Sequence, residues 1–172
     1  MDQIIGRGKE NDPRHLPLFT SRRQSILNEQ LDELSPAQLK AAVQQWKRFA
    51  IRNGAVLRSI RADYNCMSLV FANRRTWVFD GELDKIFRDD GYVRLADSSG
   101  LKVGDLVVYR KEKEFRHVGI VVDIKRPIDL ADEEIITVNS KWGADGEYLH
   151  PIGGVPEIFG KEVEFWTESK IP

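Results

Sequence analysis

The chain has 172 residues, of which 41% are hydrophobic and 31% are charged, and its formal net charge is −1. This length and composition fit one domain with an ordinary hydrophobic core, and they argue against global disorder. The near balance of 26 basic and 27 acidic residues gives no general surface for nucleic acid. We therefore expect a folded protein without a nucleic-acid partner.

The small number of cysteines and histidines limits the possible chemistry. Cys66 is the only cysteine, which excludes an intrachain disulfide and a multi-cysteine metal site. His15, His117 and His150 are far apart and lack metal-ligand spacing, so we expect no metal and no other cofactor.

Neither a secretory signal nor a membrane span is indicated by the sequence. Residues 1–9 contain no apolar core of a signal peptide, and no run of about 18 apolar residues exists to cross a bilayer. We expect a soluble cytoplasmic protein with no membrane partner, or one exported by a route that uses no cleaved signal. The sequence does not indicate an oligomeric state.

The first 34 residues read as an N-terminal extension. Residues 1–20 are polar and contain several glycines and prolines, which is typical of an irregular arm. Residues 21–34 carry isoleucine and leucine at helical spacing and predict a short helix. We expect residues 1–34 to form this arm and helix, and residues 35–172 to form the main domain, the two making one compact unit.

The clearest predicted helix begins after Ser35. Ser35 is a good N-cap, Pro36 fits the first helical position, and Asn53 followed by Gly54 is a natural stop. An apolar stripe runs along this helix, with mostly polar and basic residues opposite. Its members are Leu39, Ala42, Val43, Trp46, Phe49 and Ala50. A stripe of this kind predicts a helix that packs on the core.

The second half of the chain predicts strands. Residues 103–110 and 117–124 form two β-rich runs around a charged hairpin tip at residues 111–114. Further strands are expected at residues 135–142, 148–150 and 163–166, with a polar loop at 126–134; a connector is expected at 56–63 and a short helix at 82–88. Helices followed by a meandering antiparallel sheet describe an α+β domain.

Cys66 and His117 are the leading candidates for catalysis. Cys66 begins an apolar run at residues 66–72, and at a helix start the free backbone N–H groups and the helix dipole favour the thiolate. His117 opens a predicted strand, so the two side chains form a nucleophile–base pair if the fold brings them together. Otherwise, Cys66 is a buried small hydrophobe and His117 a histidine bonded to backbone or water.

The surroundings of these residues resemble a known family. The segments VGDLVVY (103–109) and HVGIVV (117–122) resemble the hairpin of NlpC-like cell-wall peptidases and related CHAP amidases, which are papain-like thiol hydrolases. In that family a cysteine at a helix start precedes the hairpin, as NCMSLV (65–70) does here. The usual Cys-Ser-Gly is replaced by Cys66-Met67-Ser68. The resemblance covers about half of the chain, roughly residues 60–145.

Three later segments resemble a less characterised bacterial branch of the same superfamily. They are SKWG (140–143), GEYLH (146–150) and VPEIFG (155–160). The resemblance implies a papain-like core, in which a helix bearing the cysteine packs on the sheet. It also implies a hydrolase that cleaves an amide bond in a peptide-like or protein substrate. Cys66 would form the acyl-enzyme, with His117 as general base and then general acid.

The remaining site candidates follow from chemistry and strand alternation. The backbone N–H of Cys66, with Tyr64 or Asn65, would stabilise the oxyanion. Ser140 or Asn139 would orient His117: alternation and the branch resemblance favour Ser140, and chemistry favours Asn139.

Two further residues are candidates for lining the substrate cleft, and each has a structural alternative. His150 lies in a loop that could fold over the site, where it could line the cleft or replace the third catalytic histidine that the resembled family commonly has. A structural role is the more common outcome for such a residue. Trp142 could wall the cleft, but core tryptophans are more common. Lys141, beside it, is expected to point to solvent.

Other functions compete with the hydrolase. A non-catalytic binding module that keeps the papain-like fold is supported by Met67 after the cysteine. It is also supported by the lack, near Asn139 and Ser140, of the histidine that commonly orients the catalytic histidine in the family it resembles. An acyltransferase or deamidase would use the same cysteine–histidine pair, because acyl transfer differs from hydrolysis only in what attacks the acyl-enzyme. Because the sequence indicates no signal peptide, we expect either a cytoplasmic substrate or delivery of the protein as a toxin-like effector through a specialised secretion system.

Overall fold

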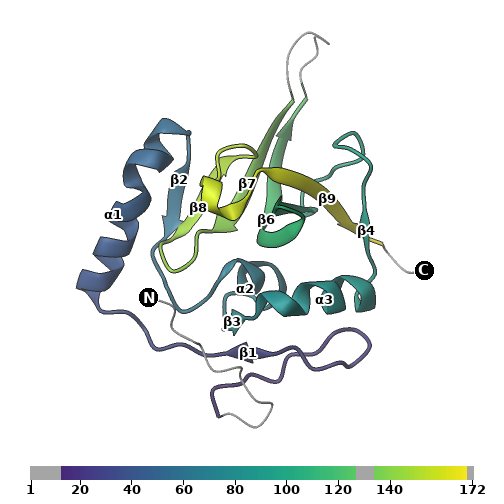
Figure 1. Ribbon diagram of the computed structural model, residues 1–172, viewed down its shortest axis with the longest axis horizontal. Helices are drawn as coiled ribbons and strands as arrows, with labels where there is room; N and C mark the ends of the chain where they lie inside the picture. Colours follow the sequence, from purple (N-terminus) through teal and green to yellow (C-terminus); the bar gives the residue numbers. More distant parts are fainter. Residues whose placement is uncertain (1–12, 127–133, 170–172) are drawn as a thin grey trace.

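The chain forms a seven-stranded antiparallel sheet with helices on both sides (Figure 1). This architecture comes from a computed structural model that describes residues 13–126 and 134–169. The strand order is β2-β8-β7-β6-β5-β9-β4. The strands are β2 (Val56–Ser59), β4 (Tyr92–Arg94), β5 (Leu106–Lys111), β6 (Glu114–Lys125), β7 (Ile135–Lys141), β8 (Glu147–Pro151) and β9 (Glu162–Glu168). The predicted α+β class is therefore confirmed.

Three α-helices, two 3₁₀ turns and a two-stranded ribbon complete the described part of the chain. They are α1 (Pro36–Arg52), α2 (Cys66–Phe71), α3 (Leu83–Asp89), the 3₁₀ turns η1 (Asp80–Glu82) and η2 (Glu157–Phe159), and the strands β1 (Asn28–Glu29) and β3 (Trp77–Val78), which pair with each other. Among these residues, no helix has the length and apolar character needed to cross a bilayer.

The meander from β5 to β8 is formed by local signals that the sequence displays. Strands β5 and β6 are joined by a two-residue turn in which Glu112 and Lys113 have φ of 55° and 66°, the positive values that match the twist of a hairpin. Strands β7 and β8 continue the meander, as predicted. The polar loop expected at residues 126–134 lies mostly outside the described residues.

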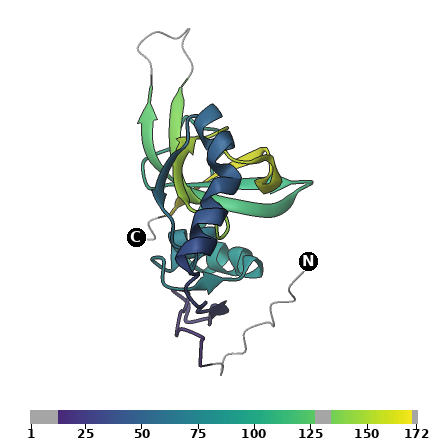
Figure 2. The ribbon, with the colours of Figure 1, turned by 90° about the vertical axis from the view of Figure 1, so that its left-hand side faces the viewer.

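Helix α1 begins and ends where its sequence predicts. Ser35 Oγ accepts from the Gln38 backbone N–H, and the Gln38 side chain in turn accepts from the Ser35 backbone N–H, which is a complete capping box. The helix lies along β2 at one edge of the sheet (Figures 1 and 2). Its apolar stripe only partly contacts the core, because Ala50 is the one buried residue of the helix.

The helix expected at residues 21–34 is wrong, because tertiary hydrogen bonds hold this segment in an extended form. Asn28 Nδ2 donates to the carbonyls of Leu16 and Ile26, and the Leu27 N–H donates to Glu82. These partners replace helical bonds and override the apolar spacing. Ile26 is buried, so the described part of the arm packs on the main body.

Two further corrections concern strands. The connector expected at residues 56–63 contains β2, which pairs with β8. The short strand β4 pairs with β9 at the opposite edge of the sheet. Neither was indicated by the sequence, because both are short edge strands whose formation depends on a distant partner.

The two faces of the sheet carry separate cores. On one face, α2 and α3 pack on side chains that include Val108 and Val118. On the other face, part of α1 packs on a second set that includes Val107, Tyr109 and Val138. Because side chains alternate along each strand, a residue's position decides which core it joins. This division determines which candidate site residues meet.

Candidate functional site

Cys66 is the first residue of α2, and Asn65 fixes the start of that helix. Asn65 Oδ1 accepts from the backbone N–H of Ser68 at 3.0 Å and of Val78 at 3.2 Å, while Nδ2 donates to the Val78 carbonyl at 2.6 Å. Asn65 therefore caps α2 and ties it to β3. Its side chain is engaged in these bonds and is not aimed at an oxyanion.

The Cys66 thiol is buried on the α2 face of the sheet, in the core that contains Val118. Burial and the nearby Asp80 carboxylate raise the pKa of Cys66 to about 12. The backbone N–H groups of Val118, Met67 and Cys66 itself act in the opposite direction and favour the thiolate. At neutral pH the side chain is a thiol, and a reaction at this sulfur needs a group that accepts its proton.

His117 lies on the opposite face of the sheet from Cys66. In the β5–β6 pairing, Val108 faces Val118 and Tyr109 faces His117, and residues directly opposite share a face. Val108 and Val118 belong to the core that contains Cys66, whereas Tyr109 belongs to the other core. The structure therefore does not bring the predicted nucleophile and base together.

The His117 ring is enclosed between aromatic side chains. It stacks on Phe159 of η2, with ring centroids 4.5 Å apart, and lies 5.7 Å from the Tyr109 ring. Neither ring nitrogen has a hydrogen-bond partner among the residues that the structure describes. Burial, together with the charges of His150 and Lys141, lowers the pKa of His117 well below its ordinary value. The imidazole is therefore neutral at pH 7.

Ser140, His150 and Trp142 form a hydrogen-bonded chain on the same face as His117. The Trp142 indole N–H donates to Ser140 Oγ at 3.1 Å, and Ser140 Oγ lies 2.8 Å from His150 Nε2. His150 Nδ1 lies 2.8 Å from the Pro151 carbonyl, so Nδ1 carries the hydrogen and Nε2 accepts from Ser140. Ser140 thus orients His150 instead of His117.

His150 and Trp142 occupy buried structural positions and do not line a substrate cleft. His150 is buried, and burial lowers its pKa to about 4. Trp142 is fully buried and stacks on Tyr148 at 4.0 Å between ring centroids. Both side chains lie in the core on the face away from Cys66.

Lys141 lies on the same face as Cys66. The sequence predicted that its side chain would point to solvent, and this prediction is wrong. Its neighbours Ser140 and Trp142 point to the other face, and the Lys141 side chain is fully buried. Its ammonium donates to the Gly143 carbonyl and lies 5.2 Å from the centre of the Tyr64 ring. Burial lowers the pKa of Lys141 to about 8, although the charges of Asp145 and Cys66 act to raise it.

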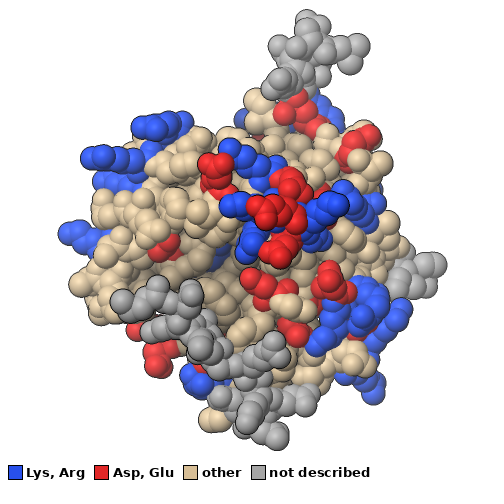
Figure 3. Space-filling view, viewed as in Figure 1, with Lys and Arg blue, Asp and Glu red and all other residues tan. Residues whose placement is uncertain are grey.

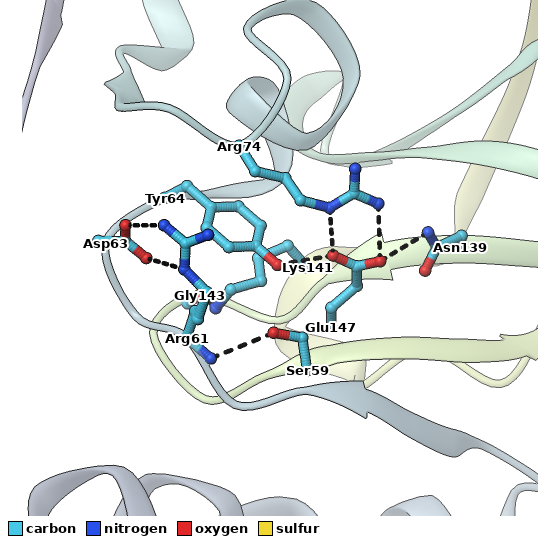
Figure 4. A network of polar contacts seen from close by, with 9 residues as sticks. All are labelled: Ser59, Arg61, Asp63, Tyr64, Arg74, Asn139, Lys141, Gly143 and Glu147. Atoms are coloured by element: carbon cyan, nitrogen blue, oxygen red, sulfur yellow. Dashed lines mark hydrogen bonds and ion pairs between the residues drawn. The ribbon is translucent and has the colours of Figure 1, made fainter. Parts of the chain in front are cut away.

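A hydrogen-bonded network around Glu147 surrounds this lysine (Figure 4). Tyr64 Oη donates to Glu147 at 2.6 Å, Arg74 donates through Nε and Nη2 at 2.8 and 2.9 Å, and Asn139 Nδ2 donates at 2.9 Å. Burial alone would raise the pKa of Glu147, but these donors outweigh it and lower the pKa to about 2. Glu147 is therefore a carboxylate at all ordinary pH values.

The Glu147 network fixes both ends of α2 to the sheet. Tyr64 precedes the helix and Arg74 follows it, whereas Asn139 and Glu147 belong to β7 and β8. Burial and the bond to Glu147 raise the pKa of Tyr64 to about 12, so its hydroxyl stays protonated. Tyr64 and Asn139 therefore position Cys66 through Glu147. The bond of Tyr64 does not match the predicted oxyanion role, and the bond of Asn139 does not match the predicted role of orienting His117.

The sequence carried one signal for this site. Asn139 and Lys141 share the face of β7 opposite to Val138, which alternation alone predicts. Which of the two faces receives Cys66 depends on the packing of α2, and the sequence does not reveal that.

No three Cys, His, Asp or Glu side chains gather as metal ligands within the described ranges. Comparisons with protein-family models, curated proteins and solved structures found no match.

Proposed function

We propose that the protein is a thiol hydrolase that cleaves an amide bond in a peptide-like or protein substrate, with Cys66 as nucleophile and Lys141 as proton acceptor. The observation that carries this proposal is a fully buried lysine on the face of the sheet that holds Cys66. Its pKa of about 8 leaves part of the amine neutral near physiological pH. A general base is most effective when its pKa lies near the working pH.

The reaction would proceed by acyl transfer. The neutral Lys141 amine takes the proton from Cys66 Sγ as the sulfur bonds to the substrate carbonyl carbon. The resulting ammonium returns this proton to the leaving amine, the C–N bond breaks, and a thioester remains on Cys66. Water then attacks the thioester while Lys141 accepts its proton, and the sulfur leaves with a proton as the acid product forms.

Backbone donors beside the sulfur would stabilise the oxyanion. The N–H groups of Cys66 and Met67 lie close enough to the sulfur to lower its pKa, in opposition to burial. In well-studied enzymes, one such donor contributes about 10²–10³ to the rate. Asn65 contributes indirectly, because its cap holds this turn of α2 in place.

The stability cost of Lys141 supports a functional role. A buried lysine whose pKa is lowered destabilises the folded protein, at pH values below its folded pKa, by about 1.4 kcal/mol for each pKa unit. An apolar side chain of similar length would avoid this cost. Ionisable residues retained under such conditions are frequent at functional sites.

Acylation by a chromogenic ester tests the proposal. We expect p-nitrophenyl acetate to release one equivalent of nitrophenol rapidly and to add one acetyl group at Cys66, as seen by intact-protein and peptide mass spectrometry. Cys66→Ala should abolish this burst, and Lys141→Met should slow it about 100-fold or more. His117→Gln is the matched control and should leave the rate nearly unchanged. A burst that depends on His117 and not on Lys141 would contradict the proposed base.

A non-catalytic binding module is the second candidate. The observation that favours it is the burial of the thiol, which is 7% exposed. In that case no acetyl group would accumulate on Cys66 in the wild type, while all the variants remained folded. The ester experiment therefore separates the two functions.

A further inference from the structure

Helix α1 leaves half of its apolar stripe without a partner. Trp46 and Phe49 pack against the core, and Ala50 is buried there. Val43 and Leu39, about one and two turns closer to the N-terminus than Trp46, are only half-buried. The amphipathic pattern therefore extends beyond what the fold of this chain uses.

These unpaired residues line a continuous apolar groove between α1 and the β2 segment. One hollow of about 420 Å³ is bounded by Leu39, Val43 and Ile60, with Pro36, Lys40 and Gln44 at its margin. A second hollow of about 360 Å³ shares Val43 and Gln44 with the first and continues to Ile51 and Leu57. Ile51 is 71% exposed and Ile60 46% exposed. Exposed apolar surface of this extent marks interaction sites.

Two basic side chains, Lys40 and Lys47, line the groove. Helix α1 carries Lys40, Lys47, Arg48 and Arg52 and no acidic residue, and β2 adds Arg58. Figure 3 shows blue side chains along the edge where Figure 1 places α1, beside a broad and mostly tan surface that contains a red side chain. None of these five forms an ion pair within the described ranges.

The acidic residues near the groove do not cancel this positive charge. Asp63 pairs with Arg61, and Asp145, which accepts from the Trp46 indole and keeps its negative charge, is a single carboxylate against the five basic residues. Asp32 and Glu33 lie only before the N-terminal end of the helix. Because the whole chain has a net charge of −1, the positive charge here is a local property of this surface.

We propose that this groove binds an acidic amphipathic helix of a partner protein. Apolar side chains at every third or fourth position would enter the two hollows, and carboxylates on either side would meet the lysines and arginines. The 17 residues of α1 provide a groove wall of about 25 Å, the length of several helical turns.

Other occupants fit this surface less well. A second copy would bring the same basic face against itself, and like charges across an interface are unfavourable. An anionic membrane favours apolar side chains that project outward, whereas Leu39 and Val43 line a hollow. This proposal does not depend on the chemistry at Cys66.

Selection from a displayed library of helical peptides tests the proposal. Peptides of about 18 residues with random side chains are long enough to lie along α1. We expect the enriched peptides to combine a helical apolar stripe with a net negative charge. Their affinity should fall steeply when salt is raised. Failure to enrich any peptide, or enrichment without an acidic bias, would overturn the proposal.

Variants of the groove then locate the binding. Val43→Asp and Lys47→Glu should each weaken the selected peptides about tenfold or more, whereas Lys102→Glu, an exposed control distant in sequence from α1, should not. Val43 is half-buried, so circular dichroism will verify that its variant folds. An affinity for the selected peptides that neither groove variant changes would overturn the proposal. So would binding of anionic phosphatidylglycerol vesicles with no peptide binding, or self-association that Val43→Asp abolishes.

Discussion

At the scale of single residues, Lys141 is the least expected feature of the molecule. It is fully buried, and its ammonium donates to the Gly143 carbonyl and lies 5.2 Å from the centre of the Tyr64 ring. Neither partner carries a full negative charge. Burial outweighs the more distant charges of Asp145 and Glu147 and lowers the pKa to about 8, so the folded state holds this lysine at a cost in stability.

Replacing Lys141 should stabilise the protein. The pKa of Lys141 is about 8 in the folded protein and about 10.5 when unfolded, so the unfolded state binds more protons between these values. Wild-type stability should rise with pH across this window. Lys141→Met should raise the unfolding free energy by about 2–3 kcal/mol at pH 7, and the difference should shrink toward pH 10. Urea unfolding measures this, with Lys102→Met as the exposed control. A less stable Lys141→Met protein at pH 7 would contradict it.

The buried histidines should make the fold sensitive to acid. The pKa values of His117 and His150 are lowered in the folded protein, that of His150 to about 4, against about 6.5 when unfolded. The unfolded state therefore binds protons first, and stability is lost as pH falls from about 6.5 toward 4. His117→Phe keeps the ring packing on Phe159 without an ionisable group. Its urea midpoint should fall less steeply over this window, and an unchanged slope would contradict the placement of His117.

At the scale of elements, α2 is held at both ends by one carboxylate. Glu147 receives hydrogen bonds from Tyr64 before the helix and from Arg74 after it, so it fixes the six-residue helix against β8. Such a short helix has little stability of its own. Its position over the sheet, and therefore the position of Cys66, depends on this network.

Glu147→Gln should loosen α2. The amide removes the charge that Arg74 and Tyr64 meet, and we expect a loss of about 2 kcal/mol, moderated by the partial exposure of Arg74. Backbone amides of α2 should exchange hydrogen faster, which mass spectrometry detects. Glu114→Gln, which removes an exposed pair with Arg116, should change stability by less than about 0.5 kcal/mol. Equal effects of the two variants would contradict the role of Glu147.

Local signals explain which elements could be predicted from sequence. Ser35 and Gln38 cap α1 by themselves, and the turn at Glu112 and Lys113 joins two β-rich runs. The helix predicted at residues 21–34 does not form, because the hydrogen bonds of this segment go to side chains far along the chain, such as Glu82. Helix periodicity contains no information about such partners.

At the scale of the whole molecule, the two faces of the sheet have different contents. Cys66, Lys141 and the Glu147 network occupy one face, whereas His117, His150 and Ser140 occupy the other. The sequence places His117 and Val118 side by side, and a shift of one residue exchanges their faces. This is why the candidate residues could be recognised from sequence while their pairing could not.

The pH dependence of Cys66 alkylation by iodoacetamide tests the central claim most directly. With Lys141 as proton acceptor, the rate should rise through an inflection near pH 8. Lys141→Met should remove this inflection and leave only the rise toward the pKa of the thiol at about 12, while His117→Gln should leave the profile unchanged. An inflection that survives Lys141→Met, or that disappears with His117→Gln, would contradict the pairing of Cys66 with Lys141.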